Sequence, residues 1–511
     1  MPENDKDILI TGIHRSGTTL VCRLLLSLDN VVALQEPIKV TRLAGLDSAE
    51  KKIFIREFIE KARFELLHFH ETRSRFSKDA VTDNYFPDEP SLGGLRITKE
   101  ENGAVTFSKP LSEDFSLVIK HNAAFTALLD ELYPTFNCFA IVRNPLALLA
   151  SWQTVDMAVN KGRMPVAEAL DSDFSNVISS IDSVLDRQIF ILNWFFEKYT
   201  RTLPSANIIR YEDIISSGGK QLARILPVAS LLNESLSSRN ANPIYNSHKL
   251  PEIVEKLLYS EGFWQQFYSK DEIEKLADRL LGINWLPASN LYGQYCVPAA
   301  SAHRPVSQRI LGGSIHEPDT IEFIRKNCGD GDVVHAGTFF GDFLPGISTA
   351  LSPGAKIWAF EPNYENYYCA QKTIRANSLQ NTELRHAALG ETETKVHLLI
   401  RACDGKNLGG ASRITDDNIP DSSVEVRLVS VDQTIPPDRK ISVIQLDIEG
   451  YEKHALSGAL GTISRNKPVI IIEDNNRITE TDWFELNILS LGYKITGRVH
   501  NNYIITCLPA Q

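Results

Sequence analysis

Short apolar runs, each ending in polar or glycine residues, recur through the first half of the chain. They span residues 8–10, 31–34, 116–119 and 138–142. Runs of this length without polar alternation are typical of strands buried on both faces of a parallel sheet. Two longer stretches, 53–69 and 176–199, carry apolar side chains at helical spacing and predict helices. The pattern therefore predicts an α/β fold.

The pattern breaks at residues 287–306, PASNLYGQYCVPAASAHRPV, which carry three prolines, small residues and no periodicity. We expect an interdomain linker there. A second strand–turn–strand pattern follows, with apolar strands at 332–336 and 357–360. The predicted parts of the chain are a first domain at 1–287, a linker at 288–305 and a second domain at 306–511.

Length and composition agree with two or more domains in one soluble chain. The 511 residues exceed what one hydrophobic core usually holds. The chain is 43% hydrophobic and 23% charged, as is typical of soluble globular proteins. Its net charge of −11 gives a nucleic-acid or membrane-surface role no global support. We therefore expect no nucleic-acid partner, and any anionic ligand must be met by local cations.

The cysteines and the N-terminus bear on the compartment. Seven scattered cysteines, without C-x-x-C or tight His/Cys spacing, favour reduced thiols and argue against a zinc site. The polar start, MPENDKD, lacks the layout of a signal peptide, and no apolar run reaches the ~18 residues of a membrane helix. We expect a cytoplasmic protein with no bound metal and no membrane insertion. The oligomeric state stays open, with a homodimer as one option.

The first apolar strand leads through a glycine turn into an apolar helix, ILITGIHRSGTTLVCRLLL. Such a turn directs backbone N–H groups and a helix N-terminus at one point, which favours phosphate oxygens. The spacing is that of the ATP-binding loop G-x-x-x-x-G-K-[ST], but the lysine is absent and the loop cation is Arg15. An ordinary βα turn is the alternative. The candidate anion-binding residues are Gly12, His14, Arg15, Ser16, Gly17, Thr18 and Thr19.

Polar residues also follow the next two strands, at the sheet edge where α/β proteins bind ligands. Glu36 precedes Pro37, which disfavours helix, so its carboxylate is expected on an extended segment and is a candidate general base. Lys120 and His121 end the strand that begins at residue 116. A solvated turn glutamate and a histidine that is merely hydrogen-bonded are the structural alternatives.

The fourth strand ends in Arg143, and Ser151 follows eight residues later, two turns into a helix. A guanidinium binds phosphate through two parallel hydrogen bonds, and a hydroxyl adds a donor. The motifs R-S-G-T-T and V-R-N-P-x5-S-W together resemble the sulfotransferases that use 3′-phosphoadenosine 5′-phosphosulfate (PAPS), in particular the tyrosylprotein and related bacterial enzymes. The resemblance covers roughly residues 5–287. It implies that Arg143 and Ser151 hold the 3′-phosphate.

The same resemblance implies a P-loop-like parallel-sheet domain that transfers a sulfuryl group from PAPS to a hydroxyl. It gives Glu36 the task of removing the acceptor proton. It makes His121 an orienting residue or the alternative base. It assigns Lys120 and Arg15, with the loop amides, to stabilising the departing phosphate.

Two other segments of the first half are read by pattern and position. Residues 70–114 are polar and irregular, and Asn102–Gly103 lies between two partly alternating runs, which favours a hairpin turn there. By position, this excursion would cover the acceptor pocket. Residues 208–213, IIRYED, repeat a late strand of the sulfotransferases and are expected to be structural.

In the second half, the strand at 332–336 runs into a turn that contains Gly337 and Gly341. The following strand ends in Glu361, twenty residues beyond Gly341. A glycine turn lets a nucleoside approach the backbone, and an acid at that strand end accepts the ribose hydroxyls. These residues alone leave dinucleotide and S-adenosylmethionine (SAM) binding open.

Later segments resemble the FkbM family of SAM-dependent O-methyltransferases. They are residues 387–390 (AALG), 428–432 (LVSVD) and 444–452 (IQLDIEGYE). The match spans roughly residues 306–511 and implies a Rossmann-like class I methyltransferase domain. It implies that Asp447 helps to bind SAM and orients or deprotonates an acceptor hydroxyl. The candidate SAM-binding residues are His335, Gly337, Gly341, Glu361 and Asp447.

Two residues depart from the FkbM pattern. His335 stands where the first motif usually has an acid, and Gln445 stands where a lysine usually precedes the K-I-D-[VI]-E-G-x-E motif. Losing that acid removes a hydrogen-bond acceptor near the methionine ammonium, which puts SAM affinity and methyl transfer in question. Glu449 is expected to be a fold acid that caps the following turn.

These expectations combine into a bifunctional tailoring enzyme, which sulfates a hydroxyl and methylates an oxygen of one small molecule or glycan. A first alternative is a sulfotransferase whose C-terminal half is a degenerate SAM-fold module for binding or dimerisation, which His335 would suit. A second is a P-loop nucleoside-triphosphate switch or kinase, against which the missing loop lysine counts.

Overall fold

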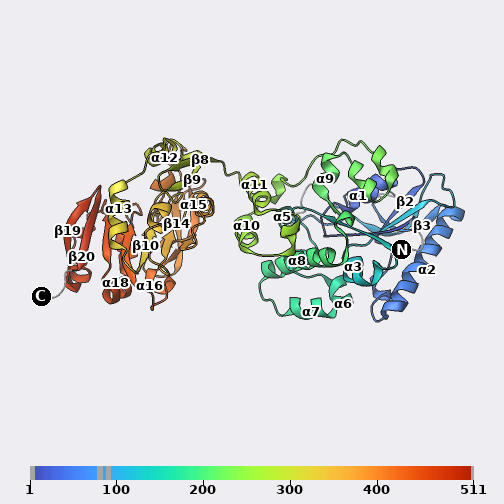
Figure 1. Cartoon of the computed structure of the whole chain (residues 1–511), viewed down its shortest axis with the longest axis horizontal. Helices are drawn as coiled ribbons and strands as arrows, with labels where there is room; N and C mark the ends of the chain where they lie inside the picture. The colour runs from blue at the N-terminus through green and yellow to red at the C-terminus, as the bar shows by residue number, and fades with distance from the viewer. Residues whose placement is uncertain (1–5, 78–83, 88–93, 508–511) are drawn as a thin grey trace. The chain divides into compact units, whose positions relative to one another are not determined.

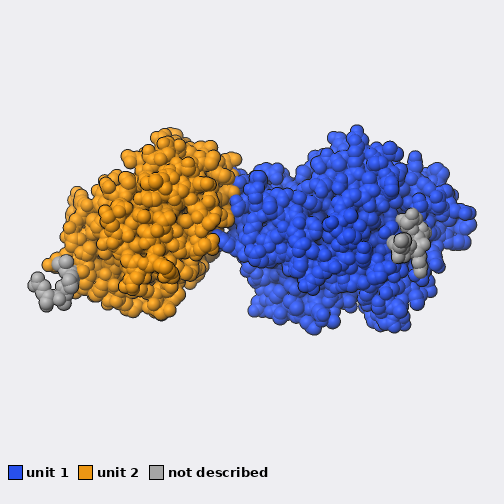
Figure 2. Space-filling model, viewed as in Figure 1, with its two compact units in different colours: residues 1–282 blue, residues 283–511 orange. Residues whose placement is uncertain are grey.

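Parallel strands form the central sheet of the first unit, in which β2 is labelled in Figure 1. Their order is β2-β5-β1-β6-β7. They are β1 (Asp7–Gly12), β2 (Val31–Gln35), β5 (Ser116–Lys120), β6 (Asn137–Val142) and β7 (Ile208–Arg210). The computed structural model describes residues 6–77, 84–87 and 94–507. The chain divides into two units, 1–282 and 283–511 (Figure 2). The four apolar runs of the first half are therefore strands of one sheet.

Helices surround this sheet, some packed on its strands and others on neighbouring helices. The main ones are α1 (Thr18–Leu26), α2 (Ser48–Phe69), α3 (Asn122–Ala127), α5 (Pro145–Trp152), α9 (Tyr211–Ser216), α10 (Leu250–Tyr259) and α11 (Lys270–Leu281). The single helix expected at 176–199 is instead two, α7 (Ser172–Ser179) and α8 (Val184–Thr202). The break arises because the Ser183 side chain accepts a hydrogen bond from Asp186 N and caps α8.

The expected hairpin exists, but its turn was misplaced. Strands β3 (Glu71–Phe76) and β4 (Glu101–Thr106) pair antiparallel, so Asn102–Gly103 lies inside β4. Asn102 uses its side chain to donate a hydrogen bond to the Glu36 carbonyl oxygen, 3.1 Å away. This long-range contact, rather than a tight turn, accounts for the asparagine.

The prediction of a linker at 288–305 is also wrong. Strands β8 (Trp285–Asn290) and β9 (Gly293–Pro298) form an antiparallel hairpin within the second unit. The hairpin packs on α15 (Tyr364–Ala376), where Cys296 N donates to Thr373 Oγ1 at 3.1 Å. The proline and small residues of this segment therefore belong to a hairpin that tertiary packing stabilises, and not to a linker.

The second unit is built on a sheet of order β12-β11-β10-β17-β18-β20-β19. Its strands are β10 (Asp332–Ala336), β11 (Ile357–Phe360), β12 (Thr382–Arg385), β17 (Ile441–Leu446), β18 (Val469–Glu473), β19 (Tyr493–Val499) and β20 (Asn502–Cys507). The first five are parallel and follow the doubly-wound order, as expected for a Rossmann-like domain. The antiparallel pair β19–β20 closes one edge, next to the C-terminus (Figure 1).

Helices cover the two faces of this sheet, and a smaller sheet adjoins it. The helices include α13 (Pro318–Asn327), α14 (Leu344–Ser348), α17 (Glu452–Ser457) and α18 (Leu460–Asn466). The smaller sheet joins β13 (Ala388–Leu389), β16 (Ser423–Val429), β14 (Thr394–Leu399) and β15 (Arg413–Thr415). Within the described ranges, no helix is both long and apolar enough to cross a membrane.

Candidate active sites

In the first unit, strand register brings the predicted site residues to one sheet edge. Lys120 is in register with Ile10 on one side and with Gln35 on the other. Gly12 is in register with Ile141, two residues before Arg143. The glycine loop, Glu36, Lys120 and Arg143 thus all follow carboxyl ends of adjacent parallel strands, where ligands bind in such sheets.

The loop after β1 leaves no room for a side chain at either of its glycines. Arg15 and Gly17 have positive φ values of 74° and 92°. A Cβ on Gly12 would lie 2.4 Å from Thr18 Cγ2, and one on Gly17 would lie 2.8 Å from the Tyr211 ring. The helix α1 starts at Thr18, and no described side chain caps it. Its first N–H groups therefore face the loop without a side-chain partner.

Arg143 is a buried cation at this edge, with 4% of its surface exposed. Its Nε donates to Asn240 Oδ1 at 2.8 Å, and its Nη1 donates to the Arg15 carbonyl oxygen at 2.9 Å. Arg15 in turn donates from Nε to Ser151 Oγ at 3.3 Å. Burial, with the charges of neighbouring arginines, lowers the pKa of Arg15 to about 10. Among the described residues, neither guanidinium has a carboxylate within ion-pair distance.

Three polar atoms at this edge are buried without a partner in the described parts of the chain. They are His14 Nδ1, Ser16 Oγ and Arg143 Nη2. Unpartnered buried polar atoms are rare because each loses its hydration on folding. A ligand with phosphate oxygens would supply acceptors for the hydroxyl and the guanidinium.

Tyr245 belongs to the same cluster and was missed in the sequence. Its phenol lies close enough to Ser151, Arg143 and Arg15 for all three to influence its pKa. Burial would raise the pKa of Tyr245, but the Arg143 and Arg15 charges outweigh burial and lower it. No local pattern distinguishes this tyrosine, because it lies 94 residues beyond Ser151 in an irregular polar segment.

Glu212 of the R-Y-E-D segment, residues 210–213, holds the Arg143 side chain in place through Asn240. Glu212 accepts hydrogen bonds from Asn240 Nδ2 at 2.8 Å and from Asn144 N at 3.0 Å. Its second oxygen accepts from Tyr268 Oη at 2.8 Å. Glu212 therefore orients Asn240, which holds the Arg143 guanidinium, as befits a structural segment.

Glu36 lies between two cations. Its Oε1 is 2.8 Å from Lys120 Nζ, and its Oε2 is 2.8 Å from Nη1 of Arg75, a residue of β3. Arg75 also contacts Glu100 at 3.0 Å. Burial would raise the pKa of Glu36, but Lys120 and Arg75 outweigh it and hold the pKa well below its ordinary value. Arg75 was not anticipated, because its contact depends on a hairpin distant in sequence.

Of the two predicted histidines, His121 is buried and His14 is half-buried. His121 Nε2 donates to the Ile38 carbonyl oxygen at 3.1 Å, and burial lowers its pKa. Burial lowers the pKa of His14 to about 4, and His14 senses the charges of Glu36 and Lys120. The structure thus groups His14 and His121 with the Glu36 cluster, while Thr18 and Thr19 start α1.

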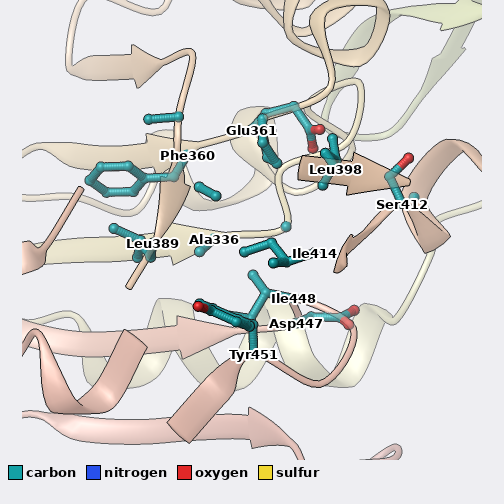
Figure 3. A pocket seen from close by; sticks show the side chains of 15 residues that line it. Ala336, Phe360, Glu361, Leu389, Leu398, Ser412, Ile414, Asp447, Ile448 and Tyr451 are labelled. Atoms are coloured by element: carbon teal, nitrogen blue, oxygen red, sulfur yellow. The ribbon is translucent and has the colours of Figure 1, made fainter. Parts of the chain in front are cut away.

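In the second unit a pocket opens at the carboxyl edge of β10, β11 and β17 (Figure 3). It contains about 460 Å³ of empty space, part of it open to solvent. Glu361 and Leu398 lie on one side in this view, and Asp447 and Tyr451 lie on the other. The lining is mainly apolar: Ala336, Gly337, Phe360, Glu361, Pro362, Ala387, Ala388, Leu389, Leu398, Gly410, Ser412, Ile414, Asp447, Ile448 and Tyr451.

The glycine turn beside this pocket is closely packed. Gly337 and Gly341 have φ values of 85° and 82°. A Cβ on Gly337 would lie 1.8 Å from the Asp447 carbonyl oxygen, so no side chain fits. Glu361 is buried, and its two oxygens accept from Phe339 N and Asn363 N, both at 2.8 Å. Burial raises the pKa of Glu361 to about 7.

The two departures from the FkbM pattern turn out to be neighbours. His335 and Gln445 are register partners on β10 and β17, and His335 Nδ1 donates to Gln445 Oε1. The imidazole stacks on Phe343 with ring centres 5.4 Å apart. Burial lowers the pKa of His335 to about 4, so the pair is neutral. His335 and Gly341 are not among the residues that line the pocket.

Acidic residues follow β17 and β18. Burial and the charge of Glu473, which ends β18, raise the pKa of Asp447 well above its ordinary value. Glu452, not Glu449, caps the turn, since it accepts from Ile448 N and Gly450 N at 3.1 Å each. The expectation for Glu449 was therefore wrong. No group of three or more His, Cys, Asp or Glu in the described ranges is arranged to hold a metal ion.

Comparison with known proteins identifies part of the second unit. The methyltransferase FkbM domain matches residues 327–495. No curated protein matches the chain. Similar solved structures include methyltransferase FkbM from Methylobacillus flagellatus KT (14% identity, 78% of this chain and 80% of that chain, TM-score 0.25). They also include a SAM-dependent methyltransferase from Aquifex aeolicus (14%, 40% and 94%, 0.23) and TYW2 from M. jannaschii in complex with AdoMet (10%, 43% and 83%, 0.26). Residues 327–495 therefore contain a methyltransferase FkbM domain.

Proposed function

We propose that the second unit transfers a methyl group from SAM to an oxygen of a small molecule or glycan. The observation that carries this is the FkbM domain at 327–495, whose pocket lies between Glu361 and Asp447. The residues fit the cofactor. The apolar lining suits an adenine ring. Glu361 Oε2 accepts only from Phe339 N and keeps a lone pair for a ribose hydroxyl, whereas Oε1 accepts from both Asn363 N and Asn366 Nδ2.

SAM supplies an electrophilic methyl group, and the protein must ready the acceptor. Asp447 is suited to receive the proton of an acceptor hydroxyl. Burial and Glu473 raise its pKa, and a carboxylate with a raised pKa is a stronger base once ionised. An alternative is that this unit only binds the cofactor or dimerises, as the loss of the motif acid at His335 allows.

We propose that the first unit transfers a sulfuryl group from PAPS to a hydroxyl of the same acceptor. This rests on two guanidiniums, the buried Arg143 and the half-buried Arg15, that no described carboxylate neutralises. Arg143, Ser151 and Tyr245 would hold the 3′-phosphate. The loop amides, Arg15 and Lys120 would stabilise the departing phosphate. The new bond joins acceptor oxygen to sulfur, and the sulfur–phosphate bridge breaks.

Glu36 is the candidate base of this transfer, but its ion pairs restrain it. With Lys120 and Arg75 both within 2.8 Å, its carboxylate is a weak base. A phosphate that draws Lys120 away would remove one cation and raise the basicity of Glu36. The geometry therefore suits a base that becomes active after the donor binds.

Calorimetric titration of the full chain tests both assignments. The ligands are 3′-phosphoadenosine 5′-phosphate (PAP) and S-adenosylhomocysteine (SAH), with AMP and ATP as controls. We expect SAH to bind, and PAP to bind at least about tenfold more tightly than AMP, since an added charge-assisted contact contributes 1.5–3 kcal/mol. Preference for ATP over PAP would overturn the PAPS assignment, and absence of SAH binding would overturn the SAM assignment.

A further inference from the structure

Glu36, the candidate base of the first unit, has an uncommon backbone conformation. It follows β2 directly, and its φ is 43°. This left-handed value is rare for a residue other than glycine, and it is not the extended conformation that Pro37 favours. The extended segment predicted at Glu36 is therefore wrong. Contacts from other elements must hold the residue in this conformation, since local preference opposes it.

The main-chain and side-chain polar atoms of Glu36 contact two different elements. Lys120 of β5 makes two of the contacts, because its carbonyl oxygen accepts from Glu36 N and its Nζ lies 2.8 Å from Oε1. The β3–β4 hairpin makes the other two. Asn102 Nδ2 donates to the Glu36 carbonyl oxygen at 3.1 Å, and Arg75 Nη1 lies 2.8 Å from Oε2. The carboxylate is therefore held by a different cation at each oxygen.

Strand register determines where the hairpin makes its two contacts. Arg75 and Asn102 are register partners on β3 and β4, so their side chains lie on the same face of the hairpin. One residue earlier, Gln35 N donates to Ser74 Oγ at 3.0 Å, which joins β2 to β3 directly beside Glu36. The place of Arg75 next to the carboxylate therefore follows from backbone pairing as well as from its long side chain.

In the described ranges, two cations and two imidazoles face the Glu36 carboxylate. The cations are Lys120 and Arg75, and the imidazoles are those of His14 and His121. Burial lowers the pKa of both imidazoles. In the proposed transfer the donor phosphate draws Lys120 away, so the cation that stays at the carboxylate is Arg75.

We propose that Arg75 is a positioning residue for the Glu36 base: it holds Oε2 and leaves Oε1 to receive the proton of the acceptor hydroxyl. This rests on the proposed sulfuryl transfer of the first unit. The acceptor O–H bond breaks and its proton goes to Oε1. The acceptor oxygen bonds to sulfur, and the electron pair of the broken sulfur–oxygen bridge stays on the donor phosphate. Glu100, 3.0 Å from Arg75, offsets part of the Arg75 charge, so the carboxylate keeps some basicity.

Calorimetric titration of the full chain with PAP at pH 6, in buffers of different ionisation enthalpy, tests the role of Arg75. In the wild type, Glu36 keeps Arg75 when PAP draws Lys120 away, so the carboxylate should stay ionised. In Arg75→Met the carboxylate would be left buried without a cation, and PAP binding should take up about half to one proton more than in the wild type. Arg163→Met is the control, since it removes the arginine of an exposed ion pair with Glu168, and its proton uptake should equal that of the wild type.

Two further variants separate this result from other causes. Arg75→Gln keeps hydrogen-bonding groups but no charge, and it should show the same extra uptake even if Arg75→Met folds poorly. The double variant Glu36→Gln/Arg75→Met should lose the extra uptake, because His14, His121 and the ligand phosphates remain and the carboxylate does not.

Equal proton uptake by the wild type and by both Arg75 variants would overturn the positioning role, and so would extra uptake that persists in the double variant. Wild-type protein that binds no PAP would instead remove the proposed donor itself, and this inference with it.

Discussion

Arg143 shows how much a single buried side chain depends on distant partners. Its guanidinium is oriented by Asn240, which Glu212 holds from the R-Y-E-D segment. One nitrogen, Nη2, is buried without a partner among the described residues. An arginine fixed in this way is prepared for a bidentate contact at little further cost in side-chain entropy.

Arg143→Ala should therefore weaken PAP binding about ten- to a hundredfold, as expected for a lost charge-assisted contact. SAH binding should not change, because its proposed site lies in the other unit. Arg201→Ala serves as control, since Arg201 is exposed, pairs with Glu197 at 2.7 Å in its own helix and lies over the Phe263 ring. Calorimetry measures the PAP and SAH affinities of the wild type and of both variants. Unaltered PAP affinity in Arg143→Ala would show that the 3′-phosphate assignment is wrong.

Glu36 predicts a pH dependence of stability. Its pKa is depressed in the folded protein, so its ion pairs stabilise fully above its ordinary pKa of 4.5 and lose effect as pH falls below that value. Glu36→Gln should cost roughly 3 kcal/mol at neutral pH, because it leaves the buried Lys120 unpaired. The difference from wild type should shrink in acid. Urea unfolding across this range measures it, and a difference that grows in acid would contradict the assignment.

At the scale of elements, the turn after β10 is a close contact between two backbones. Gly337→Ala adds a Cβ that overlaps the Asp447 carbonyl oxygen, in addition to left-handed strain. We expect it to destabilise the second unit by at least about 3 kcal/mol and to abolish SAH binding. Gly354→Ala is a matched control, with φ of 86° and open space around the added atom. It should cost about 1 kcal/mol, from strain alone. Similar unfolding curves for the two variants would refute the packing argument.

The neutral pair between β10 and β17 predicts a coupling. His335→Asp alone puts an unpaired carboxylate beside Gln445 in the core, and Gln445→Lys alone puts an unpaired ammonium beside His335. Each should cost roughly 3 kcal/mol. The double variant should recover most of that loss, because the new charges pair. A double-mutant cycle by urea unfolding measures the coupling, and strictly additive losses would exclude it.

The strands and glycine turns could be predicted from sequence because their causes are local. Apolar runs such as 138–142 are typical of buried strands, and Gly337 marks a turn that excludes a side chain. Contacts between residues that are distant along the chain leave no local pattern in the sequence. Arg75 reaches Glu36 from a hairpin, and Tyr245 reaches Ser151 from an irregular segment. The hairpin at 285–298 resembled a linker because its stability comes from packing on α15.

At the scale of the whole molecule, each unit has its own core and its own sheet edge that gathers candidate functional residues. Residues such as Ile8, Val21 and Ile141 pack within the first unit, and residues such as Val334 and Ile444 pack within the second. The proposed donor sites therefore draw on separate folding units. The FkbM domain supports a SAM-dependent methyltransferase function for the second unit, and sulfuryl transfer by the first unit stays a proposal.

Separate sites predict independent binding. Saturating SAH should change the affinity for PAP by less than about twofold, because no described residue is shared between the proposed sites. The reverse titration should give the same factor, since coupling free energies are reciprocal. Calorimetry with and without the second ligand measures both. A larger, reciprocal change would show that the two units communicate.

The ion pair between Lys120 and Glu36 has a consequence for kinetic order. In the proposed transfer, the Lys120 ammonium would have to pair with both the Glu36 carboxylate and the donor phosphate, and it cannot pair fully with both. The donor would therefore bind before the acceptor hydroxyl is activated. When the acceptor alone is bound, Glu36 stays paired with Lys120 and is a weak base. Initial-rate kinetics should show an ordered mechanism with PAPS first, in which PAP competes with PAPS and is noncompetitive toward the acceptor.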